Sequence, residues 1–351
     1  MALHLGFLGA GFIARYHRTM LQASGADVQI AAVYDIEVER AERFSSETGA
    51  AVVGDETAVI EASDAVYVCT WTSEHRRCVE AVAAAGKAVF CEKPLAPNLA
   101  DALEMVQAVE SAGVTNQVGL VLRDSPAFCW VRHLVQRPEA GRLMTVVFRD
   151  DQYIPIQGVY ESSWRADQAR AGSGTLLEHS IHDLDLLEWL FGPVCEVSAR
   201  TGEFHDIEGI EDLAVVTLVF EGGAVGTLTS VWHDILGRPS QRRMEVFCER
   251  AHVVLEGDVF GPVHWTFMGP DGETAERGSA ENHELFARCA EAGFKPRNPD
   301  GAFIEAVLAG RPASPDCAAA LRPHLLAEVA YRSAAAGGAT LSVPPGRPAA
   351  P

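Results

Sequence analysis

The first 120 residues alternate between short runs rich in Val, Ala and aromatic residues and longer segments whose apolar residues recur at helical spacing. The extended runs lie at residues 3–9, 28–35, 50–53, 65–70, 87–92 and 115–120. Between them, residues 36–49 and 73–86 have the period of amphipathic helices. Strands that alternate with helices need crossover connections, so this region is predicted to form a doubly wound parallel sheet flanked by helices.

After residue 120 the pattern changes to long strands that follow one another directly. A helix at 125–136 precedes a strand at 143–150, and an apolar segment at 176–190 predicts a second helix. Further strands are expected at 194–204, 212–220, 224–233, 242–249 and 251–257. Consecutive strands favour an antiparallel or mixed sheet, so the second domain is predicted to be α+β with a large open sheet.

The chain of 351 residues is longer than a single core usually supports, which favours two domains. We place an α/β domain at residues 1–122 and the α+β domain at 123–343, closed by helices at 301–310 and 321–337. Residues 344–351 are rich in Pro and Ala, so we expect a flexible tail that does not pack.

Charge and cysteine usage narrow the class of protein. With 28 Lys and Arg against 48 Asp and Glu, the net charge is −20, which argues against binding to nucleic acid or anionic lipid. The N-terminus has no basic leader region and no segment approaches 18 uninterrupted apolar residues, so we expect a cytoplasmic protein with no membrane contact. The eight cysteines form no C-x-x-C pair, which favours free thiols over disulfides or a zinc site.

The first chemical motif is "FLGAGFIA", in which Gly9, Gly11 and Ala14 spell G-x-G-x-x-A between a strand and a helix. The glycines permit a tight turn, and the N–H groups of Phe12 and Ile13 at the helix N-terminus face a pyrophosphate. Glycine turns of this kind also occur without a ligand. The motif nevertheless predicts a dinucleotide-binding Rossmann domain.

Asp35 ends the second strand and bears on which dinucleotide is bound. A carboxylate at this point accepts hydrogen bonds from the adenosine ribose. It would repel the 2′-phosphate of NADP by about 4 kcal/mol per unit charge pair at about 4 Å and an effective dielectric of about 20. NAD is therefore predicted, and NADP is less favoured; Asp35 as a simple cap of the following helix is the alternative.

The second motif is "CEKP", where Glu92, Lys93 and Pro94 follow the fifth strand. The carboxyl ends of strands line the ligand crevice of a doubly wound sheet, so Lys93 is expected beside the nicotinamide. There it would donate to a substrate oxygen, with its pKa lowered toward the working pH by burial. The alternative is a solvated surface lysine.

The third motif is "LLEHSIHDLD", residues 176–185. Glu178, His182 and Asp185 stand at i, i+4 and i+7 and are predicted to share one face of a continuous helix. Three interpretations compete, namely a metal site, a buried structural network and a proton-transfer site. No third ligand motif accompanies the Glu/His pair, so no metal is expected. His182 has the right intrinsic pKa for proton transfer, Glu178 could bind a neighbouring hydroxyl, and Asp185 would anchor the helix.

Taken in order, the glycine turn, "CEKP", the Trp-Arg pair before a glycine-rich turn and the acid-x-x-x-His helix resemble the Gfo/Idh/MocA oxidoreductase family over nearly the whole chain. The resemblance implies an NAD(P)-dependent dehydrogenase with a Rossmann domain and a second domain whose open sheet mediates oligomerisation. It also implies that Lys93 holds the reacting oxygen and His182 acts as general acid/base. Glu178 stands where the family usually has an aspartate.

The same resemblance adds residues around the cofactor. It implies that Thr70 and His75 lie near the dinucleotide and that Glu92 lies near the nicotinamide ribose. Trp71 replaces a proline that is common in the family, and it would offer a flat face to the cofactor or a sugar. Arg123 and Trp164 are candidates for the substrate side of the crevice.

The main hypothesis is therefore hydride transfer between NAD and a secondary alcohol or ketone of a sugar, polyol or cyclitol. A non-catalytic dinucleotide- or sugar-binding regulator is one alternative. A glycosidase or lyase that uses NAD transiently is another. The expected assembly is a homo-oligomer, dimer or tetramer, formed through the C-terminal sheet.

Overall fold

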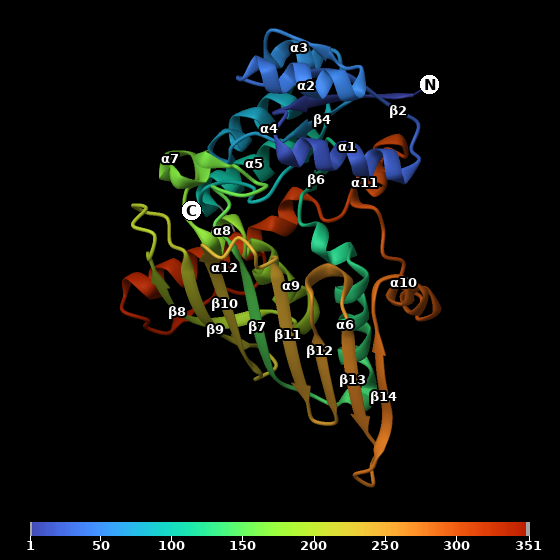
Figure 1. The fold of residues 1–351 in the computed structure, drawn as a ribbon, viewed down its shortest axis with the longest axis vertical. Coiled ribbons are helices and arrows are strands. Elements are labelled where there is room, and N and C mark those ends of the chain that lie inside the picture. Colours follow the sequence, from blue (N-terminus) through green and yellow to red (C-terminus); the bar gives the residue numbers. More distant parts are fainter. Residues whose placement is uncertain (1, 349–351) are drawn as a thin grey trace.

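The computed structural model describes residues 2–348, and its two domains lie one above the other (Figure 1). The first domain has a six-stranded sheet in the order β3-β2-β1-β4-β5-β6, with every neighbouring pair parallel. Its strands are β1 Leu3–Leu8, β2 Val28–Tyr34, β3 Ala51–Val52, β4 Ala65–Val68, β5 Ala88–Cys91 and β6 Asn116–Val118. Its helices are α1 Phe12–Ser24, α2 Val38–Thr48, α3 Glu56–Glu61, α4 His75–Ala84 and α5 Leu99–Ala112. The predicted doubly wound fold is confirmed.

The sheet order explains why the chemical motifs meet. β4 and β5 are buried at every position, because helices cover both faces of a parallel sheet. The strand order reverses around β1, which pairs with β2 on one side and β4 on the other. Ligands of such sheets bind outside the carboxyl ends of the strands at this reversal. The glycine turn after β1, Thr70 after β4 and Lys93 after β5 all lie at those ends.

The second domain has a nine-stranded sheet in the order β14-β13-β12-β11-β7-β10-β9-β8-β15. β7 and β10 run parallel, whereas the other neighbours are antiparallel, so the predicted mixed sheet is confirmed. The strands are β7 Leu143–Tyr153, β8 Val194–Gly202, β9 Leu213–Phe220, β10 Val225–His233, β11 Gln241–Cys248, β12 Ala251–Leu255, β13 Val263–Met268, β14 Thr274–Ala280 and β15 Leu341–Ser342. Strands β13 and β14 were not predicted. β14 is mostly polar and exposed, so it has little hydrophobic alternation.

Helices cover one face of this sheet. The remaining helices of the chain are α6 Pro126–Gln136, α7 Gln168–Ala171, α8 Thr175–Glu178, α9 Ile181–Phe191, α10 Asn282–Glu291, α11 Pro299–Leu308 and α12 Leu321–Ala335. Phe128 of α6, Leu187 of α9 and Leu326 of α12 share one core with Phe148 and Leu218 of the sheet. This shared core holds α9, and with it the adjacent α8, against the sheet near the first domain.

The C-terminal part of the chain returns to the first domain, which the predicted boundary at 123–343 did not include. α11 lies beside α1 (Figure 1). Phe303 and Ile304 of α11 join the core of the first domain. The turn at Cys317–Ala320 contacts α5 and β6 before α12 crosses back to β8. The segment 299–321 thus completes the first domain.

The segment expected to be a free tail is held against the protein. Arg322 donates to the carbonyl oxygens of Pro344 at 2.7 Å and Gly346 at 3.0 Å. Arg347 forms an ion pair with Glu110. The expectation of an unpacked tail is therefore wrong as far as residue 347, because Arg322 binds the backbone of this segment and Glu110 binds the side chain of Arg347. Residues 349–351 lie outside the described residues.

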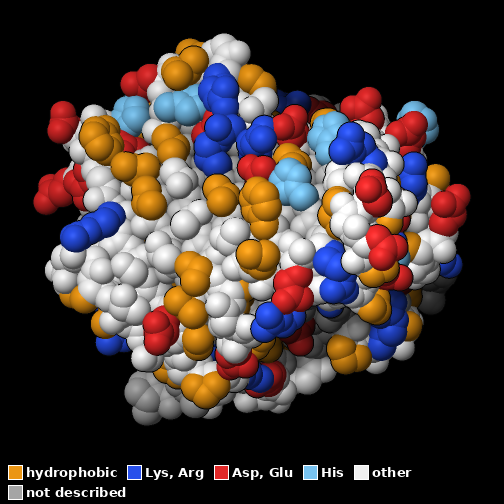
Figure 2. All heavy atoms as spheres, turned by 90° about the horizontal axis from the view of Figure 1, so that it is seen from below, with side chains coloured by type: hydrophobic (Ala, Val, Ile, Leu, Met, Phe, Trp, Pro, Cys, Tyr) orange, Lys and Arg blue, Asp and Glu red, His pale blue; other side chains and the backbone are white. Residues whose placement is uncertain are grey.

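On the face seen in Figure 2, basic and acidic side chains are intermixed rather than gathered into one basic patch. Within residues 2–348, no helix combines the length and apolar character required to cross a bilayer.

A buried histidine connects α11 to the site end of β5. His17 of α1 lies with Nδ1 2.8 Å from Asp300 Oδ1 and with Nε2 2.9 Å from Glu92 Oε1. All three side chains are buried. Burial alone would lower the pKa of His17, but the charges and hydrogen bonds of Asp300 and Glu92 outweigh it and raise the pKa to about 10. The imidazolium therefore donates to a carboxylate on each side.

We predict that His17→Ala destabilises the protein in a pH-dependent way. Because the folded pKa is raised above the ordinary 6.5, the stabilisation is fully present below about pH 6.5 and is lost as the pH rises through about 10. The free energy of unfolding should fall by about 3–5 kcal/mol at about pH 6, since two buried carboxylates lose their partner. Urea unfolding at about pH 6 and about pH 10 should show a smaller loss at the higher pH.

The matched control for this prediction is His283→Ala, which removes an exposed imidazole. It should leave the free energy of unfolding nearly unchanged at both pH values. A destabilisation by His17→Ala that is the same at both pH values would contradict the charged state of His17.

Candidate active site

The turn after β1 has the features of an anion site. Gly9 has φ +89°, and a Cβ there would lie 2.4 Å from the carbonyl oxygen of Cys69, so only glycine fits. Gly11 is the N-cap of α1, no side chain caps this terminus, and the first turn carries no acidic residue. The first N–H groups of α1, including those of Phe12 and Ile13, are therefore available to an anion.

Asp35 supports this turn and can still accept hydrogen bonds from a ligand. Its Oδ2 accepts from the N–H of Ala10 at 2.7 Å, and its Oδ1 accepts from the N–H of Glu37 at 2.9 Å. Each carboxylate oxygen has a second lone pair, so these bonds leave room for ribose hydroxyls. Asp35 thus orders the entry to α2 as well as the glycine turn, and the capping role and the ribose role are compatible.

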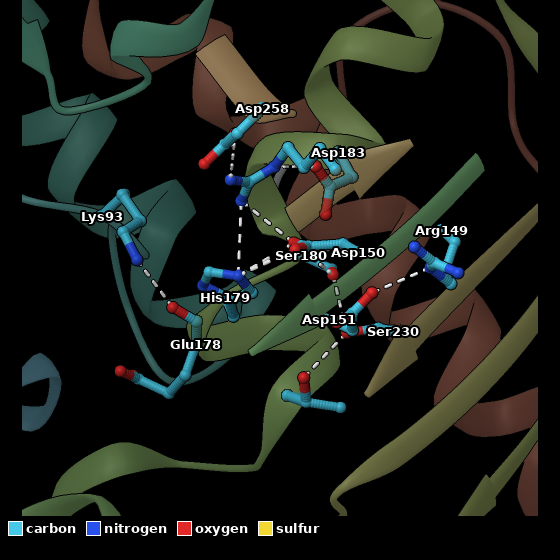
Figure 3. Close-up of polar contacts among 12 residues, drawn as sticks. Lys93, Arg149, Asp150, Asp151, Glu178, His179, Ser180, Asp183, Ser230 and Asp258 are labelled. Atoms are coloured by element: carbon cyan, nitrogen blue, oxygen red, sulfur yellow. Dashed lines mark hydrogen bonds and ion pairs between the residues drawn. The ribbon is translucent and has the colours of Figure 1, made fainter. Parts of the chain in front are cut away.

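Lys93 extends from the end of β5 into the second domain. Its Nζ donates to the backbone carbonyl of Glu178 at 2.7 Å (Figure 3). Burial and the nearby charge of Arg165 lower the pKa of Lys93, although Glu178 and Glu92 partly oppose this. Lys93 is therefore not the solvated surface lysine of the alternative interpretation.

The helix that carries the third motif is interrupted, which corrects the prediction of one continuous helical face. α8 ends at Glu178 and α9 begins at Ile181. Between them, the hydroxyl of Ser180 bonds Ser230 at 2.7 Å, and the ring of His179 lies 2.9 Å from Asp150. Contacts with the sheet thus replace a turn of helix at this point. Glu178 and His182 consequently belong to two different helices.

Glu178 is held by two residues that were not among the predicted site residues. Its Oε1 accepts from the Thr72 hydroxyl at 2.6 Å, and its Oε2 accepts from Arg165 Nε at 3.0 Å. The side chain is buried. Thr72 belongs to the first domain and Arg165 to the second, so the carboxylate joins both. Thr72 lies between the predicted Thr70 and His75, and Arg165 belongs to the Trp-Arg pair, but no spacing rule connects either residue to Glu178.

His182 lies in the first turn of α9 and is 9 % exposed. Within residues 2–348 its ring nitrogens have no hydrogen-bond partner. Burial together with the charges of Lys93 and Arg242 lowers the pKa of His182 well below 6.5, so the ring is neutral. A nearly buried polar group without a partner needs an explanation, and a ligand that binds it is one.

The other residues predicted near the cofactor hold the loops around Lys93. Glu92 accepts the N–H of Lys93 at 3.2 Å through the oxygen that His17 does not use. Burial would raise the pKa of Glu92, but the hydrogen bond and charge of His17 lower it. His75 is buried between the carbonyl oxygens of Pro94 and Thr70, at 2.9 and 3.3 Å from its two nitrogens. His75 therefore ties the loop after β4 to the loop after β5.

The remaining candidates contact other protein groups. The ring of Trp71 lies 4.0 Å below the guanidinium of Arg170, which belongs to the second domain. Trp164 stacks under Arg165 at 4.3 Å and so supports the arginine that binds Glu178. Arg123 forms a two-pronged ion pair with Asp185. The structure thus gives Arg123 a structural partner, and Asp185 anchors α9 as expected.

Two family models match this chain. One, described as an oxidoreductase family with an NAD-binding Rossmann fold, matches residues 3–120. The other, the GFO/IDH/MocA C-terminal domain, matches residues 128–254. The chain belongs to the Gfo/Idh/MocA oxidoreductase family. The first match contains Asp35 and Lys93, and the second contains Glu178 and His182.

Individual relatives of this Gfo/Idh/MocA protein agree with that assignment. An uncharacterized oxidoreductase of Bacillus subtilis strain 168 is 30% identical over 253 residues, 69% of this chain and 70% of that protein. Myo-inositol 2-dehydrogenase of Thermotoga maritima is 28% identical over 320 residues, 88% of this chain and 90% of that protein. A solved structure of levoglucosan dehydrogenase with NADH and levoglucosan has a TM-score of 0.85 at 20% identity, covering 98% of this chain and 100% of that one. At that identity the likeness concerns the fold.

The first domain of this family member fits an NAD molecule. A Cβ added at Gly11 would meet nothing within 4 Å, so open space lies above the uncapped start of α1. The loops after β4 and β5 flank this space on neighbouring strands. The uncapped N–H groups suit a pyrophosphate, and the free lone pairs of Asp35 suit a ribose.

We predict that Gly11→Ala weakens NAD binding without destabilising the fold. Gly11 has φ −75°, which alanine adopts freely, and the new methyl group meets no protein atom. The methyl group would instead occupy the space over the helix terminus, so the Kd for NAD should rise at least tenfold, or about 1.4 kcal/mol. Calorimetric titration with NAD and thermal unfolding test the two halves of the prediction.

Gly222→Ala is the matched control, because a Cβ there also meets nothing within 4 Å and the residue lies in the β9–β10 turn. It should change neither the Kd for NAD nor the Tm. Unchanged NAD affinity in Gly11→Ala would be evidence against a pyrophosphate at the start of α1.

Proposed function

We propose that this Gfo/Idh/MocA protein transfers hydride between NAD and a secondary alcohol or ketone of a sugar, polyol or cyclitol. One observation carries the proposal. The amine of Lys93 bonds the chain at the interruption between α8 and α9, and its charge lowers the pKa of His182, whose ring has no partner within residues 2–348. Relatives named as an inositol 2-dehydrogenase and a 1,5-anhydro-D-fructose reductase support this class of substrate.

We assign the cofactor contacts to groups at the carboxyl ends of the first sheet. Gly9, Gly11 and the N–H groups of Phe12 and Ile13 would hold the pyrophosphate, and Asp35 would hold the adenosine ribose. Thr70, Trp71, His75 and Glu92 would line the nicotinamide half, with His75 and Glu92 acting through the loops they fix. When bound, NAD supplies the hydride acceptor at its nicotinamide ring.

The protein's own residues handle the oxygen and its proton. Lys93 would donate a hydrogen bond to the reacting oxygen in addition to the one it gives to Glu178. His182 is neutral because its pKa is lowered, so it can accept the hydroxyl proton during oxidation and return it during reduction. Glu178 would position this pair, because its carboxylate already binds Thr72 and Arg165.

The test compares Lys93→Met and His182→Gln with the unmodified enzyme. NADH formation is followed by absorbance over a panel that includes myo-inositol and levoglucosan. Each substitution removes a group that stabilises charge or moves the proton, so kcat/KM should fall about 10²–10⁴-fold. Lys87→Met is the control, because Lys87 also donates to a carbonyl oxygen, that of Ser63, away from the site.

Three results would count against the proposal. Equal activity in Lys93→Met and in the unmodified enzyme would refute the proposed mechanism. NAD binding without conversion of any sugar would favour the regulator. Sugar cleavage or elimination without net NADH would favour transient use of the cofactor.

We further propose that copies of the chain associate through the open face of the second sheet, in the cytoplasm. Val147, Val215, Val225 and Phe247 are large apolar residues with 38–48% exposure. Strand pairing puts them on the same face. Val225 and Phe247 each lie opposite Thr145, Val147 is two residues along β7, and Val215 lies opposite Thr229, four residues along β10 from Val225. Exposed apolar surface of this kind favours association.

Val147→Lys should shift the assembly toward monomers at micromolar concentration, because a lysine in the interface would bury an unpaired charge. Light scattering coupled to size exclusion measures the mass. Leu308→Lys, at an exposed position of α11 that is 62% accessible, is the control and should leave the mass unchanged. An unmodified protein that is monomeric would refute the association itself.

A further inference from the structure

His179, in the interruption between α8 and α9, takes no part in the proposed proton transfer. Its Nε2 lies 2.9 Å from Asp150 Oδ2 and 3.1 Å from Oδ1. Its Nδ1 has no partner among residues 2–348, and the side chain keeps 14% exposure. One edge of the ring is therefore fixed by the protein and the other edge is open.

A buried charged cluster holds the fixed edge. We call it the Arg242 cluster; it consists of Arg242, Asp150, Asp183 and Asp258. Arg242 contacts Asp150 at 3.0 Å, Asp183 at 2.8 Å and Asp258 at 3.0 Å. Since the guanidinium is 5% exposed and already surrounded by three carboxylates, Asp150 has little freedom to move. The acceptor that orients His179 is consequently rigid.

The shorter of two contacts determines the tautomer of the ring, because Nε2 lies 2.9 Å from Asp150 but 3.4 Å from the guanidinium of Arg242, so its proton points to the carboxylate. Burial, Arg242 and Lys93 lower the pKa of His179 well below 6.5, so the ring is neutral. A neutral ring that donates Nε2–H to Asp150 has its lone pair on Nδ1. The open edge of His179 is thus a hydrogen-bond acceptor.

The ring of His179 lies within reach of the charge of Lys93. Figure 3 shows the ring of His179 between the Lys93–Glu178 contact on one side and Asp150 on the other. The amine that we assign to the reacting oxygen and the imidazole of His179 therefore flank the same interruption of the chain.

We propose that Nδ1 of His179 accepts a hydrogen bond from a substrate hydroxyl on the carbon next to the one that is oxidised. This inference rests on the proposed function and narrows it, because it selects substrates with two adjacent hydroxyl groups. A site built to bind a hydroxyl discriminates against an analogue that lacks it. His179 would be a substrate-binding residue, and the Arg242 cluster would position it.

Two variants of similar shape distinguish the roles of the two ring nitrogens of His179. In His179→Asn the side-chain amide stands where Nδ1 was and cannot reach Asp150. In His179→Gln the amide stands where Nε2 was and leaves the Nδ1 position empty. We expect His179→Gln to lose at least about tenfold in kcat/KM for the best polyol of the panel, through KM, while His179→Asn keeps more of it.

Two further measurements use readouts other than the activity of the variants. Calorimetry with the same polyol should show the same order of affinities, with the Kd of His179→Gln raised most. In thermal unfolding His179→Gln should keep the higher Tm of the two variants, since it retains the contact with Asp150. With the unmodified enzyme, the analogue deoxygenated next to the reacting carbon should react at least about tenfold less efficiently than the polyol.

The outcomes distinguish this inference from the proposed function. Equal kcat/KM of the unmodified enzyme for the polyol and its deoxy analogue would overturn the role of His179 and leave the dehydrogenase intact. The same conclusion follows if His179→Gln matches the unmodified enzyme in Kd and KM. Absence of both turnover and binding for the whole panel would overturn the proposed function as well.

Discussion

The hydrogen bond from Lys93 to the carbonyl of Glu178 joins the two domains at the candidate site, and the rest of the site is arranged around it. Burying an amine is costly unless it finds acceptors. The carbonyl is at the C-terminal end of α8, where helical carbonyls lack a partner of their own. The interruption of the helix therefore provides the acceptor that brings the amine into the second domain.

Around this contact, buried carboxylates and nitrogen bases have different environments. Each carboxylate has a fixed partner: Glu178 has Arg165, Glu92 has His17, Asp150 has Arg242 and Asp185 has Arg123. Removing one partner from such a pair leaves an uncompensated buried charge, so these acids are suited to hold positions. His182 and one edge of His179 lack a partner within residues 2–348. The groups suited to exchange bonds with a ligand are therefore imidazoles and an amine.

The C-terminal segment is also held to the first domain by charge. α11 comes from the C-terminal part of the chain, yet its Asp300 shares the His17 imidazolium with Glu92, the residue before Lys93. Docking of α11 and placement of the Lys93 loop thus use the same buried charges. In this Gfo/Idh/MocA chain, the packing of α11 onto the first domain therefore also helps to fix the geometry of the candidate site.

Local pattern was sufficient for the parallel sheet of the first domain and for the residues at its strand ends. Strand and helix periods are properties of neighbouring residues, and parallel strands bring Gly9, Asp35 and Lys93 to one edge whatever the details of packing. His182 and Glu178 were likewise found from their spacing. The assumption of a continuous helix between them was wrong, because Ser180 and His179 bond to the sheet instead.

Tertiary structure alone decided the partners of those residues. Thr72 and Glu178 are 106 residues apart, and His179 and Asp150 are 29 apart, so no local period relates them. The return of α11 to α1 was invisible for the same reason. The edge strand β14 was missed for a different one: it pairs with the adjacent β13, but its residues are mostly polar and exposed and show little hydrophobic alternation. Spacing along a chain determines which side chains share a face, whereas the packing of distant segments determines what each side chain meets there.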